Sequence, residues 1–61
     1  MNVKNEVYVS RFKLSQVFFE NLNMWAVEIL NMQSGVGTVV ACNSEFLAEQ
    51  KLEQLRVVLG D

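Results

Sequence analysis

The chain has 61 residues, 51% of them hydrophobic, with five Lys and Arg against seven Asp and Glu. This length predicts a single domain over residues 1–61, near the lower size limit for a chain that folds alone. The net charge of −2 argues against an extended basic surface for nucleic acid or anionic membranes.

Cross-links that stabilise small domains are not available within this chain. Cys42 is the only cysteine and histidine is absent, so an internal disulfide is impossible and a structural zinc site lacks ligands. We therefore expect no metal or cofactor, and we expect a second copy or another protein to cover part of the apolar surface. Residues 1–6 lead into no apolar segment, and no stretch is long enough to span a membrane, which predicts a soluble cytoplasmic protein.

The first predicted strand covers residues 6–14, where side chains alternate between two faces. The alternation places Tyr8, Phe12 and Leu14 on one face, and Val7, Val9, Arg11 and Lys13 on the other. Residues 15–23 either extend this strand to Phe19 and turn at 20–23, or form a short helix that Ser15 caps. We favour the strand, because residues 17–19 are β-branched or aromatic and the Asn-rich segment favours a turn. The register then pairs Phe18 with Trp25 and Leu14 with Ile29.

The second strand is predicted over residues 24–33 and the third over 38–42. Except at Glu28, both faces of residues 24–33 are largely apolar, so we expect both faces to be buried. A turn of even length, either 34–35 or 34–37, places Val27 and Ile29 on the same face as Val40 and Cys42.

A C-terminal amphipathic helix follows, with Ser44 as its N-cap and Gly60 at its end. Ala48, Leu52, Leu55 and Leu59 form one stripe at 100° per residue, and this stripe is expected to cover the Trp25 face of the sheet. Phe46 and Val57 lie on the opposite side of the helix, where polar residues are usual. They indicate a second contact.

These elements predict an α+β fold, a three-stranded antiparallel meander with one helix on one face. One helix cannot cover both faces, so we expect the second face to be a protein interface. The predicted interface residues are Met24, Glu28, Leu30, Met32, Val39, Ala41, Phe46 and Val57.

No motif indicates catalysis. Without histidine there is no Ser-His or Cys-His pair, and Cys42 on the inward face of a strand suits a small core side chain. The Gly35-Val36-Gly37 segment joins two strands and lacks the helix and lysine of a phosphate-binding loop. Glu28 either forms an ion pair with Lys13 across the strands or determines specificity within an interface.

The edge segment 38–42 has no charge and no proline, so it suits pairing with a second copy or with the edge of a host protein. We therefore expect a non-enzymatic protein-protein interaction module, homodimeric or bound to a host protein, that acts as an inhibitor, regulator or accessory subunit by occluding its partner. The alternative is a nucleic-acid-associated regulatory protein that uses Lys4, Arg11, Lys13 and nearby aromatic residues.

The hairpin and the helix that follows it, with Ser44-Glu45-Phe46-Leu47-Ala48 and then Leu52 and Leu55, resemble the strand-strand-helix core of HicB-like antitoxins. The Pro-Asp and Gly-rich segment of that family is absent before the helix, where Cys42-Asn43 stands, so the resemblance implies no function here. In size, the chain also resembles small proteins of phages and mobile elements that bind and block host proteins.

Overall fold

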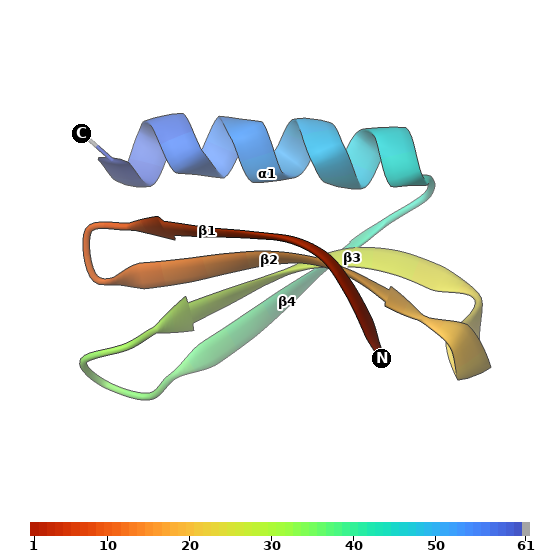
Figure 1. Ribbon diagram of the computed structural model, residues 1–61, viewed down its shortest axis with the longest axis horizontal. Coiled ribbons are helices and arrows are strands. Elements are labelled where there is room, and N and C mark those ends of the chain that lie inside the picture. Colours follow the sequence, from red (N-terminus) through yellow and green to blue (C-terminus); the bar gives the residue numbers. More distant parts are fainter. Residues whose placement is uncertain (61) are drawn as a thin grey trace.

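The computed structural model describes residues 1–60 as an antiparallel sheet followed by one helix. The four strands lie in the order β1-β2-β3-β4, so each pairs with the next along the chain, and the helix crosses one face of the sheet (Figure 1). The predicted α+β class and C-terminal helix are confirmed, whereas the predicted number of strands is wrong. The elements are β1 (Asn2–Val9), β2 (Phe12–Phe19), the 3-10 helix η1 (Glu20–Leu22), β3 (Met24–Asn31), β4 (Gly37–Cys42) and α1 (Glu45–Gly60).

The additional strand arises because the chain turns back at Ser10 and Arg11, within the segment predicted as one strand. Val9 pairs with Phe12, so their side chains share a face, whereas in a continuous strand they would lie on opposite faces. Ser10 takes a φ of 54°, and two-residue hairpin turns have a positive φ at their first central residue. Consequently Val7 and Val9 lie on the helix side of the sheet and Tyr8 lies on the other side, the reverse of the prediction.

The connection between β2 and β3 follows the preferred prediction. The strand β2 continues to Phe19, and only residues 20–22 form a single 3-10 turn, so the alternative helix over 15–23 is wrong. Asn23 closes the turn with a φ of 49°, in the left-handed region that Asn tolerates better than most residues. The predicted register is confirmed, and the centroids of the Phe18 and Trp25 rings are 5.0 Å apart.

The hairpin between β3 and β4 has the predicted even parity, but the predicted turn positions, 34–35 or 34–37, are wrong. The backbone N–H of Asn31 donates to the carbonyl of Val36 at 2.9 Å, so the turn covers residues 32–35. The register of the hairpin pairs Trp25 with Cys42, Val27 with Val40, and Leu30 with Gly37. The strand β3 ends at Asn31, two residues before the predicted end at residue 33. The cause is local. The Oδ1 of Asn31 accepts hydrogen bonds from the backbone N–H groups of residues 33 and 34, at 3.0 and 3.1 Å, and these bonds turn the chain out of the strand.

The helix α1 begins as predicted. The Oγ of Ser44 accepts a hydrogen bond of 3.1 Å from the backbone N–H of Leu47, which satisfies one of the free donors of the first turn. The predicted stripe faces the sheet, with Ala48 and Leu52 buried and two further leucines half-buried beyond them. Within residues 1–60, no helix has the combination of length and apolar character that crossing a membrane requires.

The core between sheet and helix is apolar except for one side chain. It is built from Leu14, Val27, Ala48 and Leu52, with Val7, Val9, Phe12, Trp25, Ile29, Cys42, Leu55 and Leu59 packed around them. Gln16 is fully buried on the same side. Its Nε2 donates to the backbone carbonyl of Glu45 at 3.3 Å, and its Oε1 accepts from Asn5 Nδ2 at 2.7 Å. Gln16 therefore links β1 and β2 to the start of the helix.

Candidate protein-binding face

The face of the sheet opposite α1 has no element packed on it within residues 1–60 (Figure 1). We call this surface the open face. Strand register and alternation assign to it Val3, Glu6 and Tyr8 of β1, Lys13, Ser15, Val17 and Phe19 of β2, Met24, Ala26, Glu28 and Leu30 of β3, and Val39 and Ala41 of β4.

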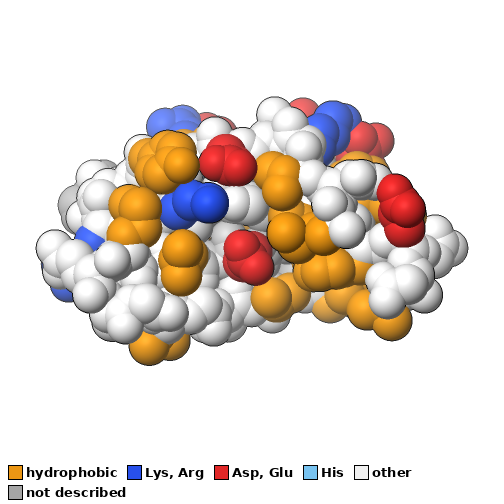
Figure 2. Space-filling view, turned by 60° about the horizontal axis from the view of Figure 1, so that its bottom comes forward, with side chains coloured by type: hydrophobic (Ala, Val, Ile, Leu, Met, Phe, Trp, Pro, Cys, Tyr) orange, Lys and Arg blue, Asp and Glu red, His pale blue; other side chains and the backbone are white. Residues whose placement is uncertain are grey.

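The open face divides into two apolar groups with charged side chains between them (Figure 2). Towards the first hairpin, Tyr8 is 63% exposed and Leu30 is half-buried, and Val39 of β4, opposite Glu28, is 50% exposed. Towards η1, Val17 and Ala26 are completely buried, although no helix in the described part of the chain lies over them. The exposed apolar surface is therefore smaller than predicted. The turn at Ser10 places two valines of β1 in the core, and two apolar side chains of the open face are themselves buried.

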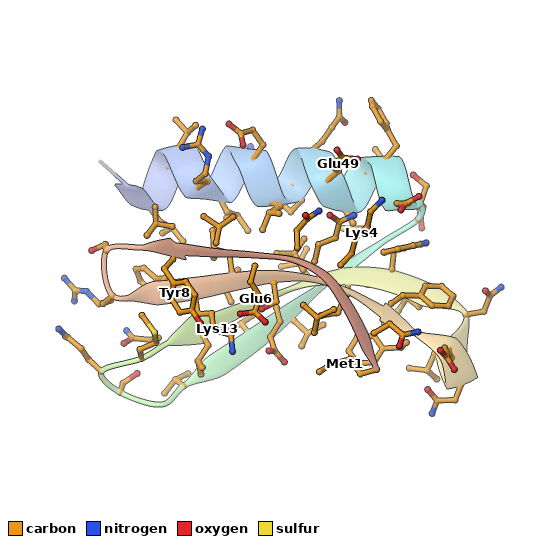
Figure 3. All side chains as sticks on the ribbon, viewed as in Figure 1. Met1, Lys4, Glu6, Tyr8, Lys13 and Glu49 are labelled. Atoms are coloured by element: carbon orange, nitrogen blue, oxygen red, sulfur yellow. The ribbon has the colours of Figure 1, made fainter. Side chains whose placement is uncertain are left out.

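A polar row crosses the middle of the open face. Glu6, Ser15 and Glu28 are direct neighbours across β1, β2 and β3, and Ser15 is almost fully buried between the two carboxylates. Tyr8 and Lys13 form the next row, and Figure 3 shows Glu6, Tyr8 and Lys13 together on the side of the sheet away from α1. The hydroxyl of Tyr8 donates to Glu6 at 3.3 Å.

The predicted ion pair between Glu28 and Lys13 does not form. Lys13 pairs with Leu30 in the register, which places it diagonal to Glu28, but the only ion pairs among residues 1–60 are those of Lys4 with Glu45 and of Arg56 with Glu53. The carboxylate of Glu28, on a half-buried residue, is therefore free to meet a charge on another molecule.

The predicted interface residues lie on separate parts of the molecule. Met24, Glu28, Leu30, Val39 and Ala41 share the open face. Met32 follows β3 in the hairpin connection and is exposed. Phe46 and Val57 are also exposed, at 64% and 52%, but they lie on α1, on the other side of the sheet. The eight residues therefore do not form one surface.

Sequence analysis missed a groove between the end of β4 and α1. Its volume is about 500 Å³, and it is lined by Ala41, Cys42, Asn43, Leu47, Gln50, Lys51 and Gln54. It depends on how far the helix lies from the edge strand, which no local pattern encodes. The half-buried thiol of Cys42 is 3.7 Å from the carbonyl oxygen of Val40, and no group of metal ligands occurs in the part of the chain that the structure describes.

The basic residues do not gather into one surface. Lys4 points to the helix side and pairs with Glu45 (Figure 3), and the hydrogen bond to this carboxylate raises the pKa of Lys4 against the opposing effect of desolvation. Lys13 lies diagonal to Glu6 and Glu28 on the open face. The remaining three cations are Arg11 in the first turn, Lys51 bonded to Gln54, and Arg56 bonded to Glu53. This arrangement does not favour the alternative nucleic-acid function, which needs a continuous basic surface.

The pair of Glu53 and Arg56 allows a test of the helix surface. The hydrogen bond from Arg56 lowers the pKa of the Glu53 carboxyl below its ordinary value. The stability that this pair adds is present above the unfolded-state pKa and is lost as the pH falls through the lower folded-state pKa. Carbon-detected NMR titration should show a lower pKa for Glu53 in the native chain than in Arg56→Gln. Equal values in the two proteins would contradict the pairing.

Comparison with known proteins gives no relative from which a role could be inferred. No protein-family model matches the chain, and neither the curated proteins nor the solved structures include a significant match. The resemblance of the last hairpin and helix to HicB-like antitoxins is not supported by such a match.

Proposed function

We propose that this chain is a small non-enzymatic protein-binding module that docks through its open face and occludes its partner, as an inhibitor, regulator or accessory subunit. One observation carries the proposal: within residues 1–60, the four-stranded sheet has its single α-helix, α1, on one face. On the other face, Tyr8 and Val39 are at least half exposed and Leu30 is half-buried. Tyrosine is enriched among the few residues that supply most of the binding energy of an interface, and apolar side chains form the buried centre around them.

The charges on the open face support selective docking. Glu6 and Glu28 flank Ser15, and neither carboxylate forms an ion pair within residues 1–60. A partner that covers this face must bring a basic or hydrogen-bond-donating side chain to Glu28, because burying an unpaired carboxylate is costly. Partners without such a group are rejected, so the polar row contributes specificity and the apolar groups contribute affinity.

The proposal is tested by placing a charge in the apolar group of the open face that contains Tyr8 and Leu30. We expect Leu30→Glu to weaken partner binding by about 100-fold, since it puts a carboxylate into a desolvated contact. The variant should still fold, because its cross-strand neighbours are Lys13, which can pair with the new carboxylate, and Gly37, which has no side chain. The measurement is affinity purification from the native host with the tagged chain, followed by titration of the recovered partner.

Phe46→Glu is the matched control, since it adds the same charge to an exposed apolar position on α1. It should bind the partner like the native chain. If folded Leu30→Glu keeps its affinity, or if Phe46→Glu is the variant that loses it, the open face is not the docking surface. Recovery of no partner at all by the native chain would contradict the proposed function.

A further inference from the structure

The two edges of the sheet differ in their protection against pairing with another chain. At the β1 edge, the register shifts between Val3 and Asn5, and the charged residues Lys4 and Glu6 lie at this irregularity. At the β4 edge, residues 38–42 have no charge, no proline and no shift of register. Bulges and charges are the features that keep sheet edges from associating. The β1 edge has both, and the β4 edge has neither.

We propose that β4 pairs in antiparallel orientation with β4 of a second copy of this chain, around a two-fold axis. As the last strand of the sheet, β4 has one row of backbone groups without a partner strand in residues 1–60. Pairing β4 with β1 of the next copy is a head-to-tail contact that does not close at two copies, and the bulged, charged β1 edge opposes it. Pairing β4 with β4 of a second copy uses both free β4 edges and gives a closed dimer. Because residues 38–42 are uncharged, a second copy brings no like charge against the strand.

Symmetry and alternation fix how the two strands meet. Thr38, Val40 and Cys42 lie on the helix side of the sheet, and Val39 and Ala41 lie on the open face. Opposite residues in an antiparallel pair point to the same face, so the two-fold axis must pass beside a single residue. With the axis at Val40, Thr38 lies opposite Cys42 of the second copy, and Val39 lies opposite Ala41 of the second copy. This register pairs all of residues 38–42.

The groove beside β4 leaves space for the second copy on the helix side. It is open between the strand end and α1, so no side chain of residues 1–60 fills the volume next to Cys42. Leu47 on its wall is 43% exposed, an apolar surface that the arriving strand would cover. Gln50 and Gln54 add amide groups that can bond to backbone at the ends of the new strand pair.

The paired molecule has an eight-stranded sheet with both helices on the same face, because the axis is perpendicular to the sheet. The two open faces then join into one surface with Val39 and Ala41 of both copies at its centre. This inference goes beyond the proposed function, since it names the second copy as a partner and assigns it a different part of the molecule. A bound protein would meet a surface that is twice as long and two-fold symmetric.

The register is tested by a disulfide. In Thr38→Cys, the new thiol lies opposite Cys42 of the second copy at a Cα separation of about 5 Å, within the range of disulfides. We expect oxidised glutathione to convert most of this variant to a covalent dimer on a non-reducing gel. The native chain and Thr38→Cys/Cys42→Ala should not cross-link. Each has one cysteine per copy, and in the proposed register the two equivalent cysteines lie four residues apart along the strands, about 13 Å. Light scattering of the native chain should give twice its mass of 7.0 kDa.

A native mass of 7.0 kDa at all concentrations would overturn the proposal, and so would a dimer in which Thr38→Cys forms no cross-link. Combining Thr38→Cys with Leu30→Glu separates this inference from the proposed function. Leu30 is on β3, away from the paired edge. We expect the combined variant to cross-link fully while it loses the other partner.

Discussion

Leu14→Ala should destabilise the fold by about 3 kcal/mol, since it removes a fully buried side chain from the centre of the core and leaves a cavity that the sheet cannot close. A chain of this size has a free energy of unfolding of roughly 3–9 kcal/mol, so this one change removes a large part of it. We expect the midpoint of thermal unfolding, measured by circular dichroism, to fall by about 15 °C.

Val36→Ala is the control for this prediction. Val36 is 64% exposed in the hairpin connection between β3 and β4, so its truncation should change the free energy of unfolding by less than about 0.5 kcal/mol. Suppose that, in urea denaturation, Leu14→Ala lowers the free energy of unfolding no more than Val36→Ala does. Leu14 would then not be part of a core with Val27 and Leu52.

Sequence predicts the second half of this fold well because its signals are local. Ser44 caps the helix, a leucine stripe marks its buried side, and Asn23 supplies the left-handed residue of the turn before β3. Two strands joined by a turn of even length also fix which side chains share a face, so Val27 and Val40 lie on one face as parity predicts. Parity does not fix which residues pair, and the observed pairs are offset from those that the predicted turns would give.

The same reasoning fails at the first hairpin, which sequence analysis predicts as one continuous strand. Its turn consists of Ser10 and Arg11, and neither is a glycine, asparagine or proline that would mark a turn. Pairing with β2 holds Ser10 at positive φ, a conformation that a serine adopts rarely by itself. Because one turn of two residues inverts the alternation, the error exchanged the faces of Tyr8 and its neighbours and enlarged the predicted apolar surface.

The candidate site is only partly predictable for a related reason. Residues such as Leu30 and Val39 are assigned to the open face by alternation, and that assignment is confirmed. Their exposure is not encoded locally, since Val17 and Ala26 are completely buried on the same face although no helix of residues 1–60 covers them. The groove beside β4 likewise depends on the path of α1 over the sheet, which packing of the whole core determines.

Gln16→Ala should cost about 2 kcal/mol, although the residue it removes is polar. The side chain is fully buried, donates to the backbone carbonyl of Glu45, and accepts from Asn5. Its truncation therefore leaves a cavity and takes partners from the strand edge and from the first turn of α1. Urea denaturation gives the loss of stability, and hydrogen exchange should show faster opening of the first turn of α1.

Asn5→Ala separates the hydrogen bond from the volume that Gln16 fills. Asn5 is exposed, so its truncation removes the 2.7 Å bond without opening a cavity and should cost about 1 kcal/mol. The double variant should then lose less than the sum of the single losses, because both single changes remove the same bond. Strictly additive losses would mean that this bond contributes nothing. Gln16 would then stabilise the junction of sheet and helix through its volume and its bond to Glu45 alone.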